Sequence, residues 1–152
     1  MYRSIVVGTD NSATAERAVQ EAAQLAKAFD CPLHIVSAYR ASAPMPAMAS
    51  LAAAEVGGSA VMLGDWLLDV RSEVVTQLEQ LGDRLRDAGV RAETHALPGS
   101  PVDAILRVAE DCGADLVVVG NKGMNGARRV LGSVPNSVAH KASCTVLVVK
   151  TC

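Results

Sequence analysis

The stretch Leu116-Val117-Val118-Val119-Gly120 is the part of the sequence that decides the fold. It consists of four consecutive apolar residues, three of them β-branched, and it ends at a glycine. A continuous apolar run of this length is typical of a strand buried on both faces, as the strands of parallel sheets are. A run of the same kind, Ser4 to Thr9, opens the chain. The two runs together predict a sheet whose strands are covered on both sides.

Helical patterns alternate with such strands along the chain. After the cluster Thr9-Asp10-Asn11-Ser12, whose residue types cap helices, apolar residues recur at helical spacing as far as Phe29. The remaining predicted elements are helices at about 60–88, at 102–112 and from about 133, and strands at 33–39, 91–97 and 145–150. Segment 41–59 is predicted to be a loop. This alternation predicts an α/β fold, a doubly wound parallel sheet with helices on both faces.

Length and composition predict one domain and exclude a general nucleic-acid-binding protein. A chain of 152 residues has the length of a single domain, which we expect to span residues 1–152. Only 3% of the residues are aromatic, and 14 Lys and Arg residues face 16 Asp and Glu residues. Proteins that bind nucleic acid polymers need a basic face and, for single strands, aromatic platforms. No nucleic acid polymer is therefore expected as a partner.

The cysteines and the apolar segments predict a cytoplasmic protein with reduced thiols. The four cysteines form no C-x-x-C motif and no Cys/His cluster with zinc spacing. The first apolar run meets Asp10 too early for the core of a signal peptide, and no stretch approaches the ~20 apolar residues of a membrane span. No membrane partner and no protein-ligated metal are predicted. His34 and His95 fall in strands, where we expect them to pack or to face solvent.

The segment from Gly120 to Ser133 carries four glycines within thirteen residues. Doubly wound sheets bind ligands beyond the carboxyl ends of their strands, and this segment follows the most clearly buried strand. Glycines let the backbone approach a ligand closely, and Gly132-Ser133 opens a helix whose free N–H groups form an anion site. The residues alone leave two readings open: the glycines hold a phosphate, or they only shape a long turn.

This segment contains neither G-x-x-x-x-G-K-[ST] nor G-x-G-x-x-G. It resembles instead the G-x2-G-x9-G-[ST] signature of the universal stress protein family, through Gly120, Gly123, Gly132 and Ser133. The resemblance extends over essentially the whole chain, from the opening Val-Gly-Thr-Asp-Asn-Ser to the closing Val-Leu-Val-Val-Lys. Two departures are a spacer of eight residues where the signature has nine, and Pro135 where several members have threonine.

The resemblance implies a Rossmann-like, five-stranded sheet of order 3-2-1-4-5 that binds an adenine nucleotide, either ATP, AMP or cyclic AMP. Asp10 would reach the ribose or a Mg²⁺ ion on the phosphates, and Ala38 would offer its backbone to adenine. Asp10 has an alternative role as the cap of the first helix, a place that Ser12 can also fill. The nucleotide-binding residues that the resemblance implies are Thr9, Asp10, Ala38, Val119, Gly120, Lys122, Gly123, Gly132, Ser133 and Val134.

Three functions are compatible with such a site. The first is a sensor or regulatory module that binds the nucleotide, and the second is a slow ATPase. Hydrolysis needs Mg²⁺-binding carboxylates and a group that positions water, and Asp10 is the sole candidate. No catalytic residue is therefore predicted. The third function is a nucleotide-free dimeric scaffold, against which the intact glycine signature argues.

The last predicted strand, Thr145 to Lys150, lies at a sheet edge in this family, and family members dimerise through it. The resemblance therefore implies a homodimer formed through this strand. Its alternating apolar residues, Val146 and Val148, would be exposed at the edge unless they were paired or covered.

Overall fold

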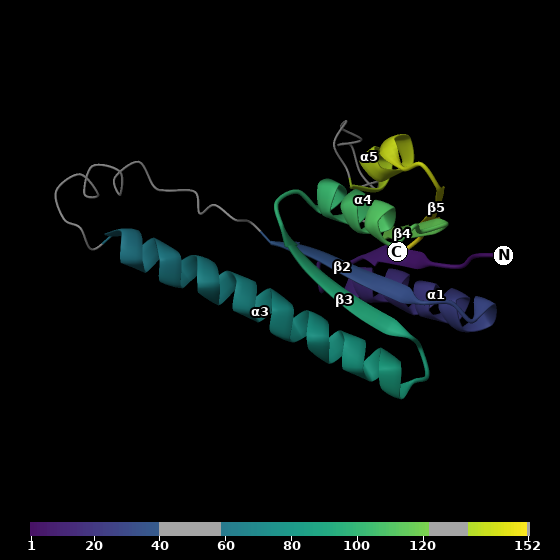
Figure 1. The fold of residues 1–152 in the computed structure, drawn as a ribbon, viewed down its shortest axis with the longest axis horizontal. Coiled ribbons are helices and arrows are strands. Elements are labelled where there is room, and N and C mark those ends of the chain that lie inside the picture. Colours follow the sequence, from purple (N-terminus) through teal and green to yellow (C-terminus); the bar gives the residue numbers. More distant parts are fainter. Residues whose placement is uncertain (40–58, 122–133, 152) are drawn as a thin grey trace.

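A computed structural model describes residues 1–39, 59–121 and 134–151, with residues 59–68 described by their backbone alone (Figure 1). Strands and helices alternate, as predicted. In chain order the elements are β1 (Ile5–Gly8), α1 (Ala13–Phe29), β2 (Leu33–Tyr39), α3 (Ser59–Asp87), β3 (Ala92–Pro98), α4 (Pro101–Asp111), β4 (Leu116–Gly120), α5 (Val134–Lys141) and β5 (Thr145–Val149). The predicted loop 41–59 lies outside the described residues except for Ser59, which begins α3.

The five strands form one parallel sheet in the order β3-β2-β1-β4-β5, which confirms the predicted fold class and strand order. β1 lies at the centre, and its first residue, Ile5, is in register with Leu33 of β2 and with Leu116 of β4. A parallel neighbour requires a crossover connection, and the helices supply these connections. The position of β1 between β2 and β4 makes it the strand from which the chain winds outward in both directions.

Two apolar clusters, one on each face of the sheet, form the core. α1 and α3 cover one face, and α4 and α5 cover the other (Figure 1). Successive residues of a strand point to opposite faces, so in β4 Leu116 and Val118 join the first cluster while Val117 and Val119 join the second. All four side chains are buried. This two-sided burial is the physical reason why the run 116–119 contains no polar residue.

The ends of α1 and α4 follow the expected capping chemistry. Ser12 is the N-cap of α1, where its hydroxyl accepts a hydrogen bond of 3.2 Å from Ala15 N. Ser100 plays the same part for α4 and accepts from Asp103 N. Pro101 occupies the first turn of α4, where its missing N–H costs nothing. The cap of the first helix is therefore Ser12, which leaves Asp10 outside the helix.

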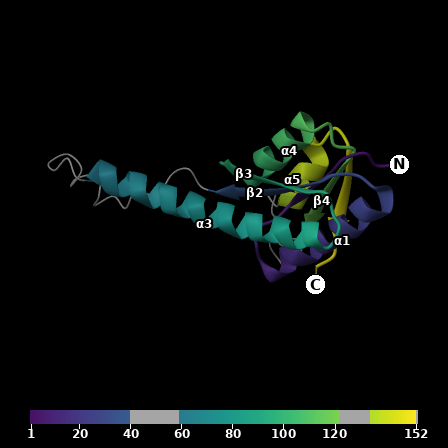
Figure 2. The same ribbon diagram turned by 60° about the horizontal axis from the view of Figure 1, so that its bottom comes forward.

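Among the side chains of α3 that the structure describes, those that pack on the sheet belong to the carboxyl-terminal half of the helix, where Leu78 and Leu81 are buried in the core. Its amino-terminal half extends beyond the sheet (Figure 2). Within the part of the chain that the structure describes, no helix combines the length and the apolar character needed to cross a membrane.

Candidate functional site

A cavity of about 200 Å³ opens where β1 and β4 end. β1 and β4 are neighbours in the sheet, but the next helix after β1, α1, covers one face, whereas the next helix after β4, α5, covers the other. This reversal is the place at which doubly wound sheets bind ligands, because the connecting segments separate there. The residues that line the cavity are Gly8, Thr9, Asp10, Thr14, Ala15, Pro101, Ile105, Val119, Gly120, Val134 and Pro135.

Five of the predicted site residues come together around this cavity. They are Thr9, Asp10, Val119, Gly120 and Val134. Ala38 is not among the lining residues: it lies near the end of β2, partly buried against the cluster under α4 and α5. The other predicted residues, Lys122, Gly123, Gly132 and Ser133, lie outside the described residues. Gly120 and Val134, on either side of that segment, both line the cavity.

Three helices begin at the cavity. Thr14 and Ala15 belong to the first turn of α1, Pro101 begins α4, and Val134 begins α5. The first turn of a helix carries free N–H groups and the positive end of the helix dipole. Among the described lining residues, Asp10 alone carries a charged side chain. The positive ends of three helix dipoles therefore favour an anionic group in this cavity.

Asp10 is held in a structured turn at the rim of the cavity. Thr9 N donates to the carbonyl of Val36 at 2.9 Å, which anchors the turn to β2. Asn11 N donates to Thr9 Oγ1 at 3.1 Å, and Ser12 N donates to Asp10 Oδ1 at 3.0 Å. The side chain of Asp10 is exposed. The turn thus presents a carboxylate to solvent beside the cavity, with one of its oxygens fixed by the backbone.

Gly8 brings the end of β1 against α4. A Cβ atom placed on Gly8 would overlap Ile105 Cδ1 and would lie 3.1 Å from Ile105 Cγ1. Only glycine lets the strand and this helix approach so closely without moving Ile105. Gly8 and Ile105 both line the cavity, so their contact determines the width of the cavity on this side.

Asn121 ties the end of β4 to the end of β5. Its N–H donates to the carbonyl of Val149 at 2.9 Å. Its Oδ1 accepts from Thr151 N at 2.8 Å and from Thr151 Oγ1 at 2.7 Å. Both residues are buried, with exposed fractions of 8% and 6%. Asn121 follows Gly120 directly, so this pair holds the end of β4, which lines the cavity, beside the end of β5.

Sequence reasoning missed six lining residues, namely Gly8, Thr14, Ala15, Pro101, Ile105 and Pro135. Most of them lie directly beside a predicted strand end or in the first turn of a predicted helix. The rule that ligands bind at strand ends would have found these. Ile105 lies one helical turn beyond Pro101 and carries no such signal. The pairing of Asn121 with Thr151 joins residues thirty positions apart and has no local pattern either.

Comparison with known proteins identifies the family of this fold. The model of the universal stress protein family matches residues 1–150. Universal stress protein Rv1636 of Mycobacterium tuberculosis is 37% identical to the chain, over 99% of this chain and 97% of that protein. A universal stress protein crystallised in complex with cAMP has a TM-score of 0.74 and 33% identity, over 99% of this chain and 98% of that one.

A universal stress protein from Archaeoglobus fulgidus, solved in complex with dAMP, has a TM-score of 0.62 and 25% identity, with 98% of each chain covered. The similarity to these proteins thus extends over nearly the whole length of both partners in each comparison. The chain therefore belongs to the universal stress protein family.

Proposed function

We propose that this protein is a regulatory module that binds an adenine nucleotide in the cavity between the ends of β1 and β4. The observation that carries the proposal is the convergence of three helix amino-termini on one cavity, at the reversal of the sheet. Fixed amide donors stabilise phosphate oxygens without a basic surface, which fits a chain of net charge −2. The complexes of two similar proteins with cAMP and with dAMP support an adenine nucleotide.

The lining residues divide into those suited to the phosphates and those suited to the sugar. The amides at the start of α5, together with Lys122, Gly123, Gly132 and Ser133, would hold the phosphates, as the family signature implies. Val119 and Gly120 would flank the ribose at the end of β4. Ala38, one strand away, would contact adenine at the outer side of the site.

Asp10 has the chemistry of a ribose or Mg²⁺ contact. Its carboxylate is exposed at the rim of the cavity. Mg²⁺ prefers carboxylate oxygens combined with phosphate oxygens of a substrate, and it is usually held by one or two carboxylates. We therefore propose that Mg²⁺, when it accompanies ATP, is bound between Asp10 and the phosphates. In the cytoplasm, the expected location, nucleotide levels would then set the occupancy of the module.

We expect Gly123→Val to abolish nucleotide binding and to leave the fold intact. A Cβ at a phosphate-contacting glycine blocks the close approach of the backbone to the phosphate. The measurement is calorimetric titration of nucleotide-free protein with ATP and Mg²⁺, with AMP and with cyclic AMP, which also ranks the three ligands. Gly126→Val is the matched control, because Gly126 lies in the same segment but outside the signature. Equal affinity in the two variants would place the phosphate elsewhere.

We also propose a homodimer formed through β5. β5 is an edge strand, with β4 as its neighbour in the sheet. Leu147 and Val148, which point to opposite faces, are each 38% exposed. Val146, expected to be exposed unless it were paired or covered, is partly buried against the cluster under α4 and α5. The apolar residues that a partner strand would cover are therefore Leu147 and Val148.

Val148→Lys should convert the dimer into a monomer, because a charged side chain on an edge strand opposes pairing with a second strand. Light scattering coupled to gel filtration under reducing conditions measures the mass. The wild type is expected at twice the 15.8 kDa of the chain and the variant at 15.8 kDa. Ala139→Lys, at an exposed position of α5, is the control and should remain dimeric. A monomeric wild type at micromolar concentration would contradict the proposal.

A further inference from the structure

Three metal-binding side chains meet on the outer half of the sheet, away from the cavity. His34 lies on β2, and Glu93 and His95 lie on the edge strand β3. The strand register places His34 opposite Glu93 and places Val36 opposite His95. Residues two apart in a strand point to the same face, so all three side chains project from the face that α4 and α5 cover.

The donor atoms of these side chains are close to one another. His34 Nδ1 lies 3.1 Å from His95 Nε2 and 3.4 Å from Glu93 Oε2. All three donor atoms lie within 4.8 Å of one another. Zinc binds imidazole nitrogen and carboxylate oxygen at about 2.0–2.2 Å in a tetrahedron, whose edges are then about 3.4 Å long. Two of the three donor separations therefore already have the length of a tetrahedral edge.

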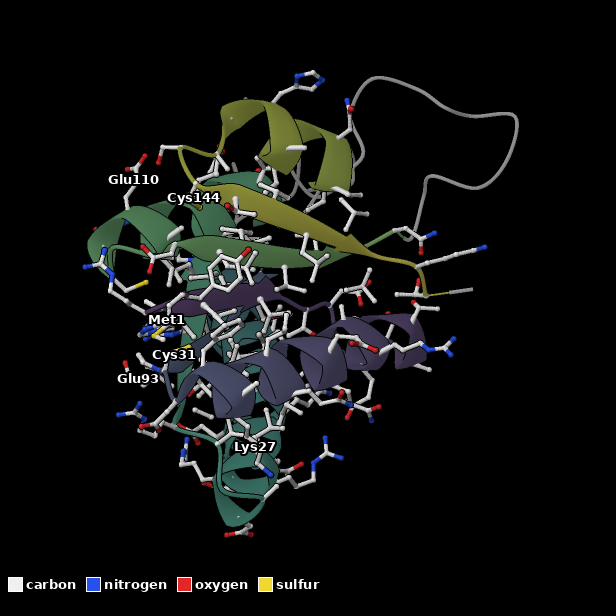
Figure 3. The ribbon with its side chains drawn as sticks, turned by 90° about the vertical axis from the view of Figure 1, so that its right-hand side faces the viewer. Met1, Lys27, Cys31, Glu93, Glu110 and Cys144 are labelled. Atoms are coloured by element: carbon white, nitrogen blue, oxygen red, sulfur yellow. The ribbon has the colours of Figure 1, made fainter. Side chains whose placement is uncertain are left out.

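The burial of the three residues suits a site that is rigid and yet accessible. His34 is only 7% exposed and is held within the sheet, and His95 is partly buried. The side chain of Glu93 is 62% exposed. Figure 3 shows Glu93 at the same side of the molecule as Cys31, the residue just before Pro32 and β2. The two histidines offer nitrogen ligands in set positions, and the exposed carboxylate of Glu93 can move. An ion can therefore enter from solvent, and Glu93 can then bind to it as the third ligand.

The donor set selects the class of ion. His34 and His95 each offer an imidazole nitrogen, and Glu93 offers a carboxylate oxygen. Imidazole nitrogen combined with carboxylate oxygen is a ligand set of zinc and its neighbours rather than of Mg²⁺ or Ca²⁺, which prefer oxygen alone. The donor set and the spacing thus agree on one class of ion.

We propose that His34, Glu93 and His95 bind a divalent transition-metal ion of the zinc class. His34 binds through Nδ1, His95 through Nε2 and Glu93 through its carboxylate, and water takes the fourth position. The ion fastens the edge strand β3 to β2. The site is separate from the proposed nucleotide site, which lies at the ends of β1 and β4, so neither proposal depends on the other.

The test begins with untagged protein that has been treated with a chelator and freed of nucleotide. Titration with Zn²⁺ should show one ion per chain, and bound Co²⁺ should show the visible absorption of a four-coordinate site. The chain also has four cysteines, and a thiolate ligand would add a strong near-ultraviolet charge-transfer band. That band would overturn the proposal, because it would place the ion on sulfur.

Variants of the ligands identify the site. Glu93→Gln and His95→Gln should each weaken Zn²⁺ binding by more than about tenfold, since even the loss of a partner outside the ligand shell costs about 10–100-fold. His140→Gln, at the exposed third histidine on α5, is the matched control and should bind like the wild type. Zn²⁺ should also raise the Tm of the wild type and the control but not of the two ligand variants, because binding to the native state stabilises it.

Both ligand variants alter residues that are exposed or only partly buried, so we expect both proteins to fold. A substitution at the buried His34 would disturb the core and is not used. Cooperative thermal unfolding without metal checks that both variants fold. Unchanged Zn²⁺ affinity in folded Glu93→Gln and His95→Gln would overturn the proposal. His34, Glu93 and His95 would then be a group of hydrogen-bonded side chains that binds no metal. Nucleotide affinity should be the same in both variants as in the wild type.

Discussion

Gly8→Ala should weaken adenine-nucleotide binding by about tenfold or more, the equivalent of about 1.4 kcal/mol. The new Cβ overlaps Ile105 Cδ1, and Ile105 lines the cavity. We expect the terminal carbon of Ile105 to move, and because Ile105 lines the cavity, this movement should narrow the space that the nucleotide would occupy. We expect the overpacking to lower the free energy of unfolding by about 1–3 kcal/mol as well. Calorimetric titration measures the affinity, and urea denaturation measures the stability.

The double variant Gly8→Ala/Ile105→Val separates the two effects. Valine lacks Cδ1, so it removes the atom that the alanine Cβ overlaps. Ile105→Val alone should cost only about 0.5–1.5 kcal/mol of stability. Because the two residues are in contact, their effects should not add, and the double variant should regain most of the affinity. A double variant that binds as weakly as Gly8→Ala would show that the nucleotide does not lie against α4.

Gly82→Ala is the matched control for this pair. A Cβ on Gly82 would lie 2.7 Å from Thr94 Cγ2 and 2.8 Å from an Arg86 guanidinium nitrogen, so it also crowds its surroundings. Gly82 lies in α3, and its crowded neighbour Thr94 lies on β3, two strands away from the cavity. Its replacement should therefore lower stability and leave nucleotide affinity unchanged.

Asn121→Ala should lower the free energy of unfolding by about 1–3 kcal/mol, because it leaves buried donors of Thr151 without their acceptor. The same change releases the link between the end of β4 and the end of β5. We therefore expect weaker nucleotide binding in addition, since Gly120, directly before Asn121 at the end of β4, lines the cavity. Urea denaturation and calorimetric titration measure the two effects.

Thr151 supplies graded controls for that prediction. Thr151→Ser keeps both donors, the backbone N–H and the hydroxyl, and should come close to the wild type. Thr151→Val keeps the N–H bond and loses the hydroxyl bond, so it should cost about 1 kcal/mol, the net contribution of one hydrogen bond. If Asn121→Ala proves no less stable than Thr151→Ser, Asn121 does not hold the two strand ends together.

The fold was predictable because its signals are local. The apolar run 116–119 identifies a strand buried on both faces, and the structure buries all four side chains. Ser12 and Pro101 mark helix starts by the chemistry of single residues, and both lie where the residue types predict. The alternation of elements with right-handed crossovers then leaves few topologies. The strand order came from the family resemblance rather than from any one of these patterns.

The candidate site was predictable only in part, because a site joins residues that lie far apart in the chain. Thr9, Asp10, Val119 and Gly120 lie directly at strand ends and could be chosen by that rule. The contact of Gly8 with Ile105 depends on how close α4 packs to β1, and no periodicity reports such a distance. Val146 on β5 is a second example of a feature that the sequence pattern does not report. Packing against the helices, rather than the alternation of residues along the strand, decides which apolar side chains of β5 stay exposed.

The two histidines His34 and His95 show most clearly what the sequence determines and what the tertiary structure decides. The sequence by itself determined that His34 and His95 lie in strands of a parallel sheet, because local apolar patterns specify strands. Only the tertiary structure decided that β2 and β3 pair with His34 opposite Glu93, which brings the three donor atoms within 4.8 Å. The physical reason is that strand register is set by the packing of two whole faces, and residues sixty positions apart meet only once that packing is complete.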